Sequence, residues 1–432
     1  MFRKEIKGGP RFLIRSTHPN VLMYGVFEAA LSKDDLEKAV FSLSDKHQLM
    51  NCHIETDKDD KVWYAIDEKL SPEVTTSTTK DINELLIKEL KHRFDLEKGP
   101  LIRFILLNET TLVINCHHAI CDGMSLLYLF QDISRALSGE EIKIEQKKPV
   151  FLELENIPQK VDNFISRFFI GLMNKKVSGK TLHFSDELFQ ELHAKYWKEY
   201  KPQVITFKLS KEESATIISA CKQHDVSVNT GLVTAFLYAE NKLFGQKDNS
   251  DRVIVTDSLR TYLKDQPGDN LGYFASTLRP SLKYNEKKPF WENAQSFHKK
   301  IKRLLEKDIL KNQIVDLFSP NLLDAVMLNL FGKRKDEVAQ KIIRKAGMYK
   351  DYATFTIANL GLIKSDDDAG KYKLKDIFGP MAASDAMEKY ISVLTINGEL
   401  HFSICSDENV VDRESILKMK ELVSQVFGEK SG

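Results

Sequence analysis

Residues 115–123, NCHHAICDG, place two adjacent histidines at the end of an apolar run and an Asp-Gly pair just after them. The preceding residues 101–114 predict a β-hairpin that turns at 108–110, and residues 124–137 carry apolar side chains at helical spacing. The histidines therefore end a strand, and AICDG forms the turn into a helix. Turns between a strand and a helix often carry functional groups.

The two histidines are not equivalent. Side chains alternate across a strand, so His117 and His118 are expected on opposite faces of it, and only one of them can face a given cavity. An imidazole with a pKa near its usual value of about 6.5 is well suited to take a proton from a hydroxyl, amine or thiol at neutral pH. One histidine is thus a candidate general base, and the other is expected to be structural.

Composition restricts the class of protein. The 432 residues fit two domains of about 200 residues each. A hydrophobic fraction of 42%, a charged fraction of 29% and a net charge of +1 indicate a globular protein and give no support to nucleic-acid binding. The N-terminal residues lack the apolar core of a signal peptide, so we expect a cytoplasmic protein. The five cysteines have no Cys-x-x-Cys spacing and are expected to be free thiols.

Strand and helix patterns alternate in both halves of the chain, which predicts an α/β fold of two subdomains. The first subdomain spans residues 1–180 and includes a crossover that starts at about residue 139. The second spans residues 181–432, and its Asn397-Gly398 pair predicts a tight hairpin turn.

The histidine turn also carries a resemblance. HHAICDG fits His-His-x-x-x-Asp-Gly, the signature of the chloramphenicol-acetyltransferase-like superfamily, which includes peptide condensation domains, alcohol acetyltransferases, plant BAHD acyltransferases and polyketide-associated acyltransferases. Residues 94–107, FDLEKGPLIRFILL, resemble the stretch that precedes the signature, and VTDSLRTYL and DNLGYFAST resemble segments of the second domain. The resemblance covers nearly the whole chain.

This resemblance implies two related subdomains with a channel between them and His118 near its middle. It implies an acyltransferase that moves an acyl group from a thioester, acyl-CoA or an acyl carrier protein, to the hydroxyl or amine of a small acceptor. His118 would be the general base, and no bound cofactor or metal is expected. His117 would be structural, Gly123 would allow close packing of the turn, and Asp122 would pair with Arg260 of the second subdomain in a bidentate ion pair.

Two departures from the family patterns matter. The Asp-Phe-Gly-Trp-Gly sequence of plant members is absent, and DIFGPMAAS at 376–384 stands in the corresponding region. No carrier-protein segment accompanies the chain, so we expect a stand-alone acyltransferase. Asn359 and Gly361 in TIANLG resemble a channel-lining segment of alcohol acetyltransferases, although a strand end with a turn glycine is an equal alternative.

Other interpretations stay open at this point. Asp122 fits the N-cap of the following helix, a role that is compatible with an ion pair. A metal site at His117, His118 and Asp122, or a nucleophilic Cys121, is less favoured. The segment 163–176, NFISRFFIGLMNKK, is expected to pack as a linker helix, and a membrane-surface role is the less favoured alternative. The alternative function is a non-catalytic or carrier-docking binding protein.

Overall fold

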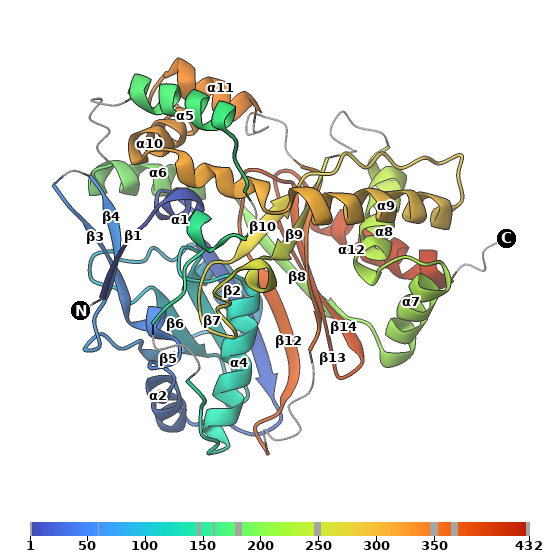
Figure 1. The fold of residues 1–432 in the computed structure, drawn as a ribbon. Coiled ribbons are helices and arrows are strands. Elements are labelled where there is room, and N and C mark those ends of the chain that lie inside the picture. Colours follow the sequence, from blue (N-terminus) through green and yellow to red (C-terminus); the bar gives the residue numbers. More distant parts are fainter. Residues whose placement is uncertain are drawn as a thin grey trace.

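The computed structural model describes residues 2–58, 60–144, 148–158, 160–177, 184–245, 252–345, 353–363 and 370–428. Two larger sheets, each covered by helices, lie side by side (Figure 1). The mixed α/β architecture predicted from the alternating patterns is therefore confirmed.

The first sheet carries the histidine turn. Its strand order is β12-β2-β7-β6-β5, and its strands are β2 (Asn20–Phe27), β5 (Val74–Thr76), β6 (Ile102–Leu106), β7 (Thr111–His117) and β12 (Leu374–Met381). The predicted hairpin is β6 and β7, which pair antiparallel. A smaller sheet of order β1-β4-β3 lies next to it, with β1 (Phe2–Glu5), β3 (Cys52–Thr56) and β4 (Val62–Ile66).

Strand β7 shows the expected alternation of side chains. Leu112 and Ile114 join the core that underlies α4, whereas Val113 joins a second core on the opposite face of the sheet. The helices of this half are α1 (Gly8–Ile14), α2 (Lys33–Ser42), α3 (Ile82–Leu90) and α4 (Gly123–Leu137). The opposite faces of β7 therefore belong to different packing environments.

The second sheet has the order β10-β9-β11-β13-β14-β8. Its strands are β8 (Pro202–Lys208), β9 (Val253–Ser258), β10 (Ala275–Leu278), β11 (Phe355–Leu362), β13 (Lys389–Ile396) and β14 (Glu399–Asp407). Strands β13 and β14 form the predicted hairpin, with positive φ at Asn397 and Gly398. Helices α7 (Lys211–Gln223), α8 (Val228–Phe244), α9 (Phe290–Asp308) and α12 (Arg413–Gly428) pack on this half.

Strand β12 departs from the predicted division of the chain. It belongs to the second half by sequence, but it pairs antiparallel with β2 and completes the first sheet. Side chains of both sheets, among them Val113, Val204, Phe378 and Cys405, form one buried core where the two halves meet. The halves are therefore joined by an exchanged strand as well as by packing.

The predicted crossover contains the 3-10 turn η2 (Leu154–Asn156) and helix α5 (Phe164–Val177), which belongs to a helical lobe built from several segments of the chain. Helices α5 (Phe164–Val177), α6 (Asp186–Glu199), α10 (Pro320–Leu330) and α11 (Glu337–Lys345) lie above α1 in Figure 1. Within the described ranges, the 3-10 turns are η1 (Gln48–Asn51), η2 (Leu154–Asn156), η3 (Arg260–Tyr262) and η4 (Lys311–Leu317). Across the described ranges, none of the helices has the length and apolar character needed to cross a bilayer.

Helix α5 packs as a linker helix on one side only. Ile170 and Val177 are buried against the lobe, but Phe164, Phe168 and Phe169 are exposed to solvent. The expectation that residues 163–176 pack as a helix is therefore confirmed for the inner face of α5, whereas the outer face is exposed.

Candidate active site at the histidine turn

His118 lies directly after β7, and hydrogen bonds of both its backbone and its ring hold it in place. Its backbone N–H donates to the carbonyl of Pro19 at 2.7 Å. Its Nδ1 lies 2.7 Å from the carbonyl oxygen of Cys121. Because a carbonyl can only accept, Nδ1 carries the proton and Nε2 keeps its lone pair. The half-buried imidazole is therefore held in the tautomer that can accept a proton at Nε2.

The surroundings of His118 also affect its pKa. Burial opposes the charged form, but the hydrogen bonding and charge around Cys121, together with the Asp122 carboxylate, outweigh it and raise the pKa of His118 above the usual value. A neutral imidazole with a raised pKa is a stronger base than an unperturbed one. This suits a group that must take a proton near neutral pH.

His117 is in a different environment. It is fully buried, its Nδ1 accepts the backbone N–H of Ala119 at 3.2 Å, and the ring of Phe94 lies edge-on to it. Burial, and secondarily the neighbouring His118, lower the pKa of His117 to about 3. A neutral ring with one nitrogen already bonded to the backbone supports the turn and is poorly placed for proton transfer.

Asp122 caps the helix that follows the turn. Its Oδ1 accepts the backbone N–H of Ser125 at 2.7 Å, which confirms the predicted N-cap. Its Oδ2 accepts the backbone N–H of Phe274 at 2.8 Å, from a segment of the second half. The carboxylate thus fixes the start of α4 and ties it to residues far away in the sequence.

The predicted partner of Asp122 is in place, with a different geometry. Arg260 Nη2 lies 3.5 Å from Asp122 Oδ1, and both residues are buried. The expected bidentate pair is wrong, because Nη2 donates to the hydroxyl of Ser125 at 2.6 Å and Nη1 donates to the carbonyls of Gly268 and Asn270. Ser125 therefore connects the two charges.

Gly123 lies where two elements of the second half approach the start of α4. A Cβ on Gly123 would come within 2.6 Å of Pro380 Cγ and 3.3 Å of Leu360 Cδ2. Pro380 belongs to the exchanged strand β12 and Leu360 to β11. No side chain fits between them, so the glycine lets the two halves close on the histidine turn.

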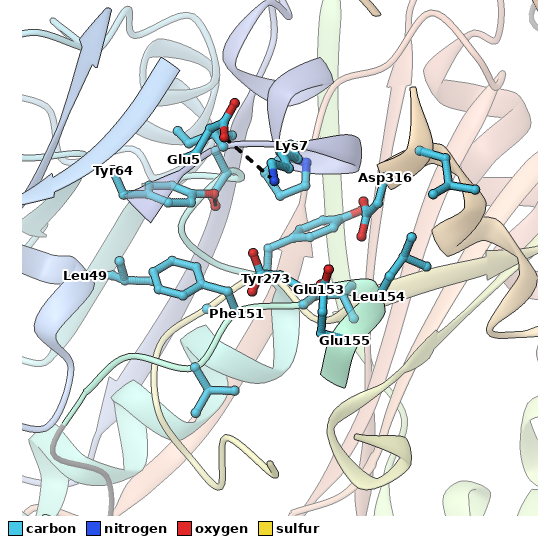
Figure 2. A pocket seen from close by; sticks show the side chains of 17 residues that line it. Glu5, Lys7, Leu49, Tyr64, Phe151, Glu153, Leu154, Glu155, Tyr273 and Asp316 are labelled. Carbon is cyan, nitrogen blue, oxygen red and sulfur yellow. Dashed lines mark hydrogen bonds and ion pairs between the residues drawn. The ribbon is translucent and has the colours of Figure 1, made fainter. Parts of the chain in front are cut away.

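A cavity adjoins the turn and is shown in Figure 2. Its volume is about 120 Å³, and Ala119 and Tyr273 are among the residues that line it. The Tyr273 ring lies edge-on to His118, with ring centroids 5.3 Å apart. Burial, followed by the charges of Asp122 and Asp316, raises the pKa of Tyr273 to about 12. Tyr273 therefore stays protonated, and its ring both lines the cavity and lies against His118.

Asp316 lines the same cavity. Figure 2 shows the side chain of Tyr273 reaching toward it across the cavity. Burial, and then the charges of Glu153 and Glu155, raise the pKa of Asp316 to about 7, although Lys7 opposes this. Tyr273 thus lies next to both the His118 imidazole and a carboxyl group whose pKa is near neutral pH.

Asn359 and Gly361 lie in an irregular part of β11. The register with β13 shifts between Asn359 and Leu362, Gly361 has a φ of 80°, and Asn359 Oδ1 accepts the backbone N–H of Gly361 at 2.9 Å. The intervening Leu360 is the residue that approaches Gly123. The structure places this bulge beside the turn, and a role of Asn359 and Gly361 in lining a channel stays a prediction.

The structure gives no support to a nucleophilic Cys121 or to a metal site at His117, His118 and Asp122. Burial raises the pKa of Cys121 well above its usual value, so the thiol is not the reactive thiolate. The Nδ1 atoms of His117 and His118 take part in separate hydrogen bonds, and the two carboxylate oxygens of Asp122 accept backbone N–H groups of Ser125 and Phe274. A separate group of Asp376, Glu399 and His401 is already matched by Lys208, whose Nζ lies 2.8 Å and 2.9 Å from the two carboxylates.

Three residues near the turn were not identified from the sequence: Ser125, Tyr273 and Asp316. Ser125 stands at the third position of α4, where an Asp N-cap makes its bonds, so a local signal existed. Tyr273 lies within a segment that resembles the family, but only the fold brings its ring to His118. Asp316 has no local signal, since its environment is made by segments distant in sequence.

The fold and the histidine turn together resemble those of the chloramphenicol-acetyltransferase-like superfamily. Residues 12–163 match the family model of the condensation domain. This match and the structural likenesses below confirm the resemblance to that superfamily, whose condensation domains and related enzymes act in acyl and peptidyl transfer.

Among curated proteins, a hybrid PKS-NRPS synthetase of Xenoacremonium sinensis is 29% identical over 133 residues, which are 29% of this chain and 3% of that protein. Surfactin synthase subunit 2 of Bacillus subtilis is 24% identical over 249 residues, 56% of this chain and 6% of that protein. The chain thus spans only a small part of the length of the relatives it matches.

Solved structures share the fold over the full chain. The first condensation domain of the CDA synthetase has a TM-score of 0.67 at 10% identity, covering 100% of this chain and 97% of that one. Trichothecene 15-O-acetyltransferase of Fusarium sporotrichioides has a TM-score of 0.64 at 12% identity, covering 98% and 94%. The epimerization domain of tyrocidine synthetase B has a TM-score of 0.64 at 15% identity, covering 99% and 96%.

Proposed function

We propose that the protein is an acyltransferase that moves an acyl group from a thioester to a hydroxyl or amine, with His118 as the general base. The observation that carries the proposal is the hydrogen bond from His118 Nδ1 to the carbonyl of Cys121. It leaves Nε2 as the basic nitrogen and fixes the direction of the ring. Acyl-CoA is the donor we favour, and an acyl carrier protein thioester is the other candidate.

The chemical step needs only one titrating side chain. His118 Nε2 takes the proton of the acceptor hydroxyl or amine while the acceptor atom attacks the thioester carbonyl, and a tetrahedral intermediate forms. The carbon–sulfur bond then breaks, the carbonyl is restored, and the proton on Nε2 passes to the departing thiolate. The products are the ester or amide and the free thiol, and the imidazole is neutral again.

Asp122, Arg260 and Gly123 position His118 rather than take part in the chemical step. Asp122 caps α4 and holds the segment at Phe274, Arg260 binds Ser125, and Gly123 allows Pro380 to approach. Together they fix the start of the helix just behind His118. A positioned base is worth more than a mobile one, because a misplacement of about 1 Å can lower the rate about 100-fold.

The alternative is a protein that binds an acylated carrier without turnover. Such a protein has no chemical need for an imidazole whose tautomer leaves a basic nitrogen free. An epimerase would also use a base, and the fold of the epimerization domain is similar. We favour acyl transfer because the superfamily match and the acetyltransferase fold point the same way.

The proposal is tested by incubating the purified protein with a panel of acyl-CoAs and acyl-pantetheines, each with alcohols or amines, and measuring free thiol. We expect acceptor-dependent thiol release that falls about 100-fold or more in His118→Ala. The variant should keep the denaturation midpoint of the parent protein. Full activity in a folded His118→Ala protein would show that His118 is not the general base. Binding of an acylated carrier protein without release of free thiol would favour the non-catalytic alternative.

A further inference from the structure

The outer face of α5 is apolar and faces solvent. Phe164 is 84% exposed and Phe168 is 55% exposed, and these two residues form one stripe with Leu172 because they recur every four positions. Ile165 and Phe169 widen the stripe, with exposed fractions of 64% and 58%. A contiguous apolar surface of this kind marks an interaction site in a folded protein.

The stripe is not a sign that the helix is loose. Ile170 and Val177 are buried on the opposite side, and Val177 packs in a core with α10 and α11. Asn174 Nδ2 donates to the carbonyl of Leu317 at 2.9 Å, and Asn174 Oδ1 accepts the backbone N–H of Ser319 at 2.8 Å. The helix is therefore fixed to the protein in an orientation that presents its apolar face outward.

A hollow opens next to the stripe. Its volume is about 1290 Å³, and Phe169 and Leu172 of α5 form part of its wall. The opposite walls come from α1, the η4 segment and α11, through Phe12, Val315 and Ile342. The exposed stripe and the hollow thus form one continuous apolar surface, here called the α5 surface.

Positive charge surrounds the α5 surface. Lysine and arginine side chains from four segments line the hollow, namely Lys176, Arg279, Lys311, Lys341 and Arg344. In the described part of the chain, no Asp or Glu is among its lining residues. The whole protein has a net charge of only +1, so this concentration of one sign is a local property.

We propose that the α5 surface docks on a membrane that contains anionic lipids. An apolar helical face with Phe, Ile and Leu, flanked by lysine and arginine, is the pattern of a helix that lies in the plane of the membrane interface. The apolar stripe would enter between the acyl chains, and the cations would meet lipid phosphates. An acidic protein would satisfy the charges but would not explain a wide, open apolar hollow.

The α5 surface lies close to the cavity at the histidine turn, which gives membrane docking a functional reason. Helix α1 and η4 separate the hollow from the cavity beside Tyr273: Pro10 and Asp316 face that cavity, whereas Phe12 and Val315 face the hollow. Under the proposed acyl transfer, a membrane-borne substrate would be near the histidine turn. The docking itself does not rest on that function, because it follows from the exposed surface alone.

Sedimentation with vesicles tests the proposal without any assay of activity. We expect binding to vesicles of phosphatidylcholine and phosphatidylglycerol, weaker binding to phosphatidylcholine alone, and loss of binding at high salt. The double variant Phe164→Ser, Phe168→Ser should lose binding by at least about tenfold, because two phenyl groups no longer enter the bilayer. Lys341→Glu should weaken binding to the anionic vesicles only.

A matched control is available on α2. Phe41 is 70% exposed and lies outside the lobe, so Phe41→Ser removes a similar side chain from another face and should leave vesicle binding unchanged. Equal binding by the double variant and the parent protein would overturn the proposal, as would absence of binding to anionic vesicles. Self-association that the double variant abolishes, without vesicle binding, would assign the surface to a protein partner instead.

Discussion

Arg260 and Asp122 lie 3.5 Å apart across the two halves of the protein, and the hydroxyl of Ser125 bridges them. The hydroxyl is 2.6 Å from Arg260 Nη2 and 2.9 Å from Asp122 Oδ1. Both charged side chains are buried, so neither can be hydrated if its partner is lost. The pair therefore couples the position of the histidine turn to the second half.

We expect Asp122→Ala to destabilise the fold by about 3 to 5 kcal/mol and to lower acyl transfer at the same time. The substitution leaves Arg260 buried without its carboxylate and removes the acceptor of the Phe274 N–H. Arg260→Ala should have a similar effect. The measurements are denaturation midpoints and rates of thiol release.

The double variant separates coupling from two independent losses. Because the two residues share one network, Asp122→Ala with Arg260→Ala should cost less than the sum of the single variants. Asp122→Asn is the conservative control, since one oxygen can still accept the Ser125 N–H. Strictly additive losses, or normal stability of Asp122→Ala with weaker substrate binding, would argue against the coupling.

The pH dependence of activity should report His118. The raised pKa of His118 places its protonation above the usual value of about 6.5, and the protonated ring cannot act as a base. We expect kcat/KM to fall as the pH decreases through that pKa. A profile that stays flat down to pH values near 5 would contradict His118 as the base.

His117 gives the control for this profile. Its pKa is lowered to about 3, so it does not change its charge in the same range. In His117→Asn the new amide oxygen can accept the Ala119 N–H in place of Nδ1. The inflection should therefore stay where it is in the parent protein, and a shifted inflection would mean that the two histidines titrate as a pair.

Features that depend on neighbouring residues were predictable from the sequence, whereas features that depend on contacts between distant segments were not. The β6–β7 hairpin, helix α4 and the Asp122 cap depend on neighbouring residues, and all three were predictable from spacing and capping chemistry. The pairing of strand β12 with β2, in contrast, depends on contacts between distant segments. Turn chemistry is local, whereas the choice of a sheet partner is not.

The same distinction between local and long-range features applies to the candidate active site. The motif located His118 and Gly123, and the resemblance located Arg260. The bridging role of Ser125 replaces the expected bidentate geometry, because Arg260 also has to bind the carbonyls of Gly268 and Asn270. Asp316 gains its raised pKa from burial and from carboxylates on another segment, so no sequence pattern could have indicated it.

Gly123→Ala should destabilise the protein by about 1 to 3 kcal/mol and reduce activity. The new methyl group would lie 2.6 Å from Pro380 Cγ, so the start of α4 or strand β12 must move. Denaturation midpoints measure the cost. If Gly123→Ala is as stable and active as the parent protein, the close approach of the two halves at this point is not needed.

Gly171 provides the matched control, because a Cβ there meets no atom within 4 Å. It lies inside helix α5, where alanine is favoured over glycine by up to about 1 kcal/mol. Gly171→Ala should therefore be neutral or slightly stabilising. A loss of stability in both alanine variants would point to a general effect of substitution rather than to a clash at Gly123.

Asp316 should make the stability of the protein depend on pH. Burial and the neighbouring carboxylates raise its pKa to about 7 in the folded protein, whereas an unfolded chain has an aspartate pKa of about 3.9. Between these two values the folded state binds a proton that the unfolded state does not. The contribution of Asp316 to the free energy of unfolding is therefore greatest below about pH 4 and is lost as the pH rises to about 7.

Asp316→Asn removes this titration while keeping the size of the side chain. At about pH 4 the variant should be about as stable as the parent protein, and at pH 8 it should be more stable, because the parent then carries a buried charge near Glu153 and Glu155. Denaturation midpoints at the two pH values measure the difference, and Glu97→Gln is the matched substitution of a carboxylate at an exposed position. An Asp316→Asn protein that is less stable than the parent at pH 8 would show that the ionised carboxylate is a favourable part of the cavity, and its negative charge would then be available to a cationic acceptor.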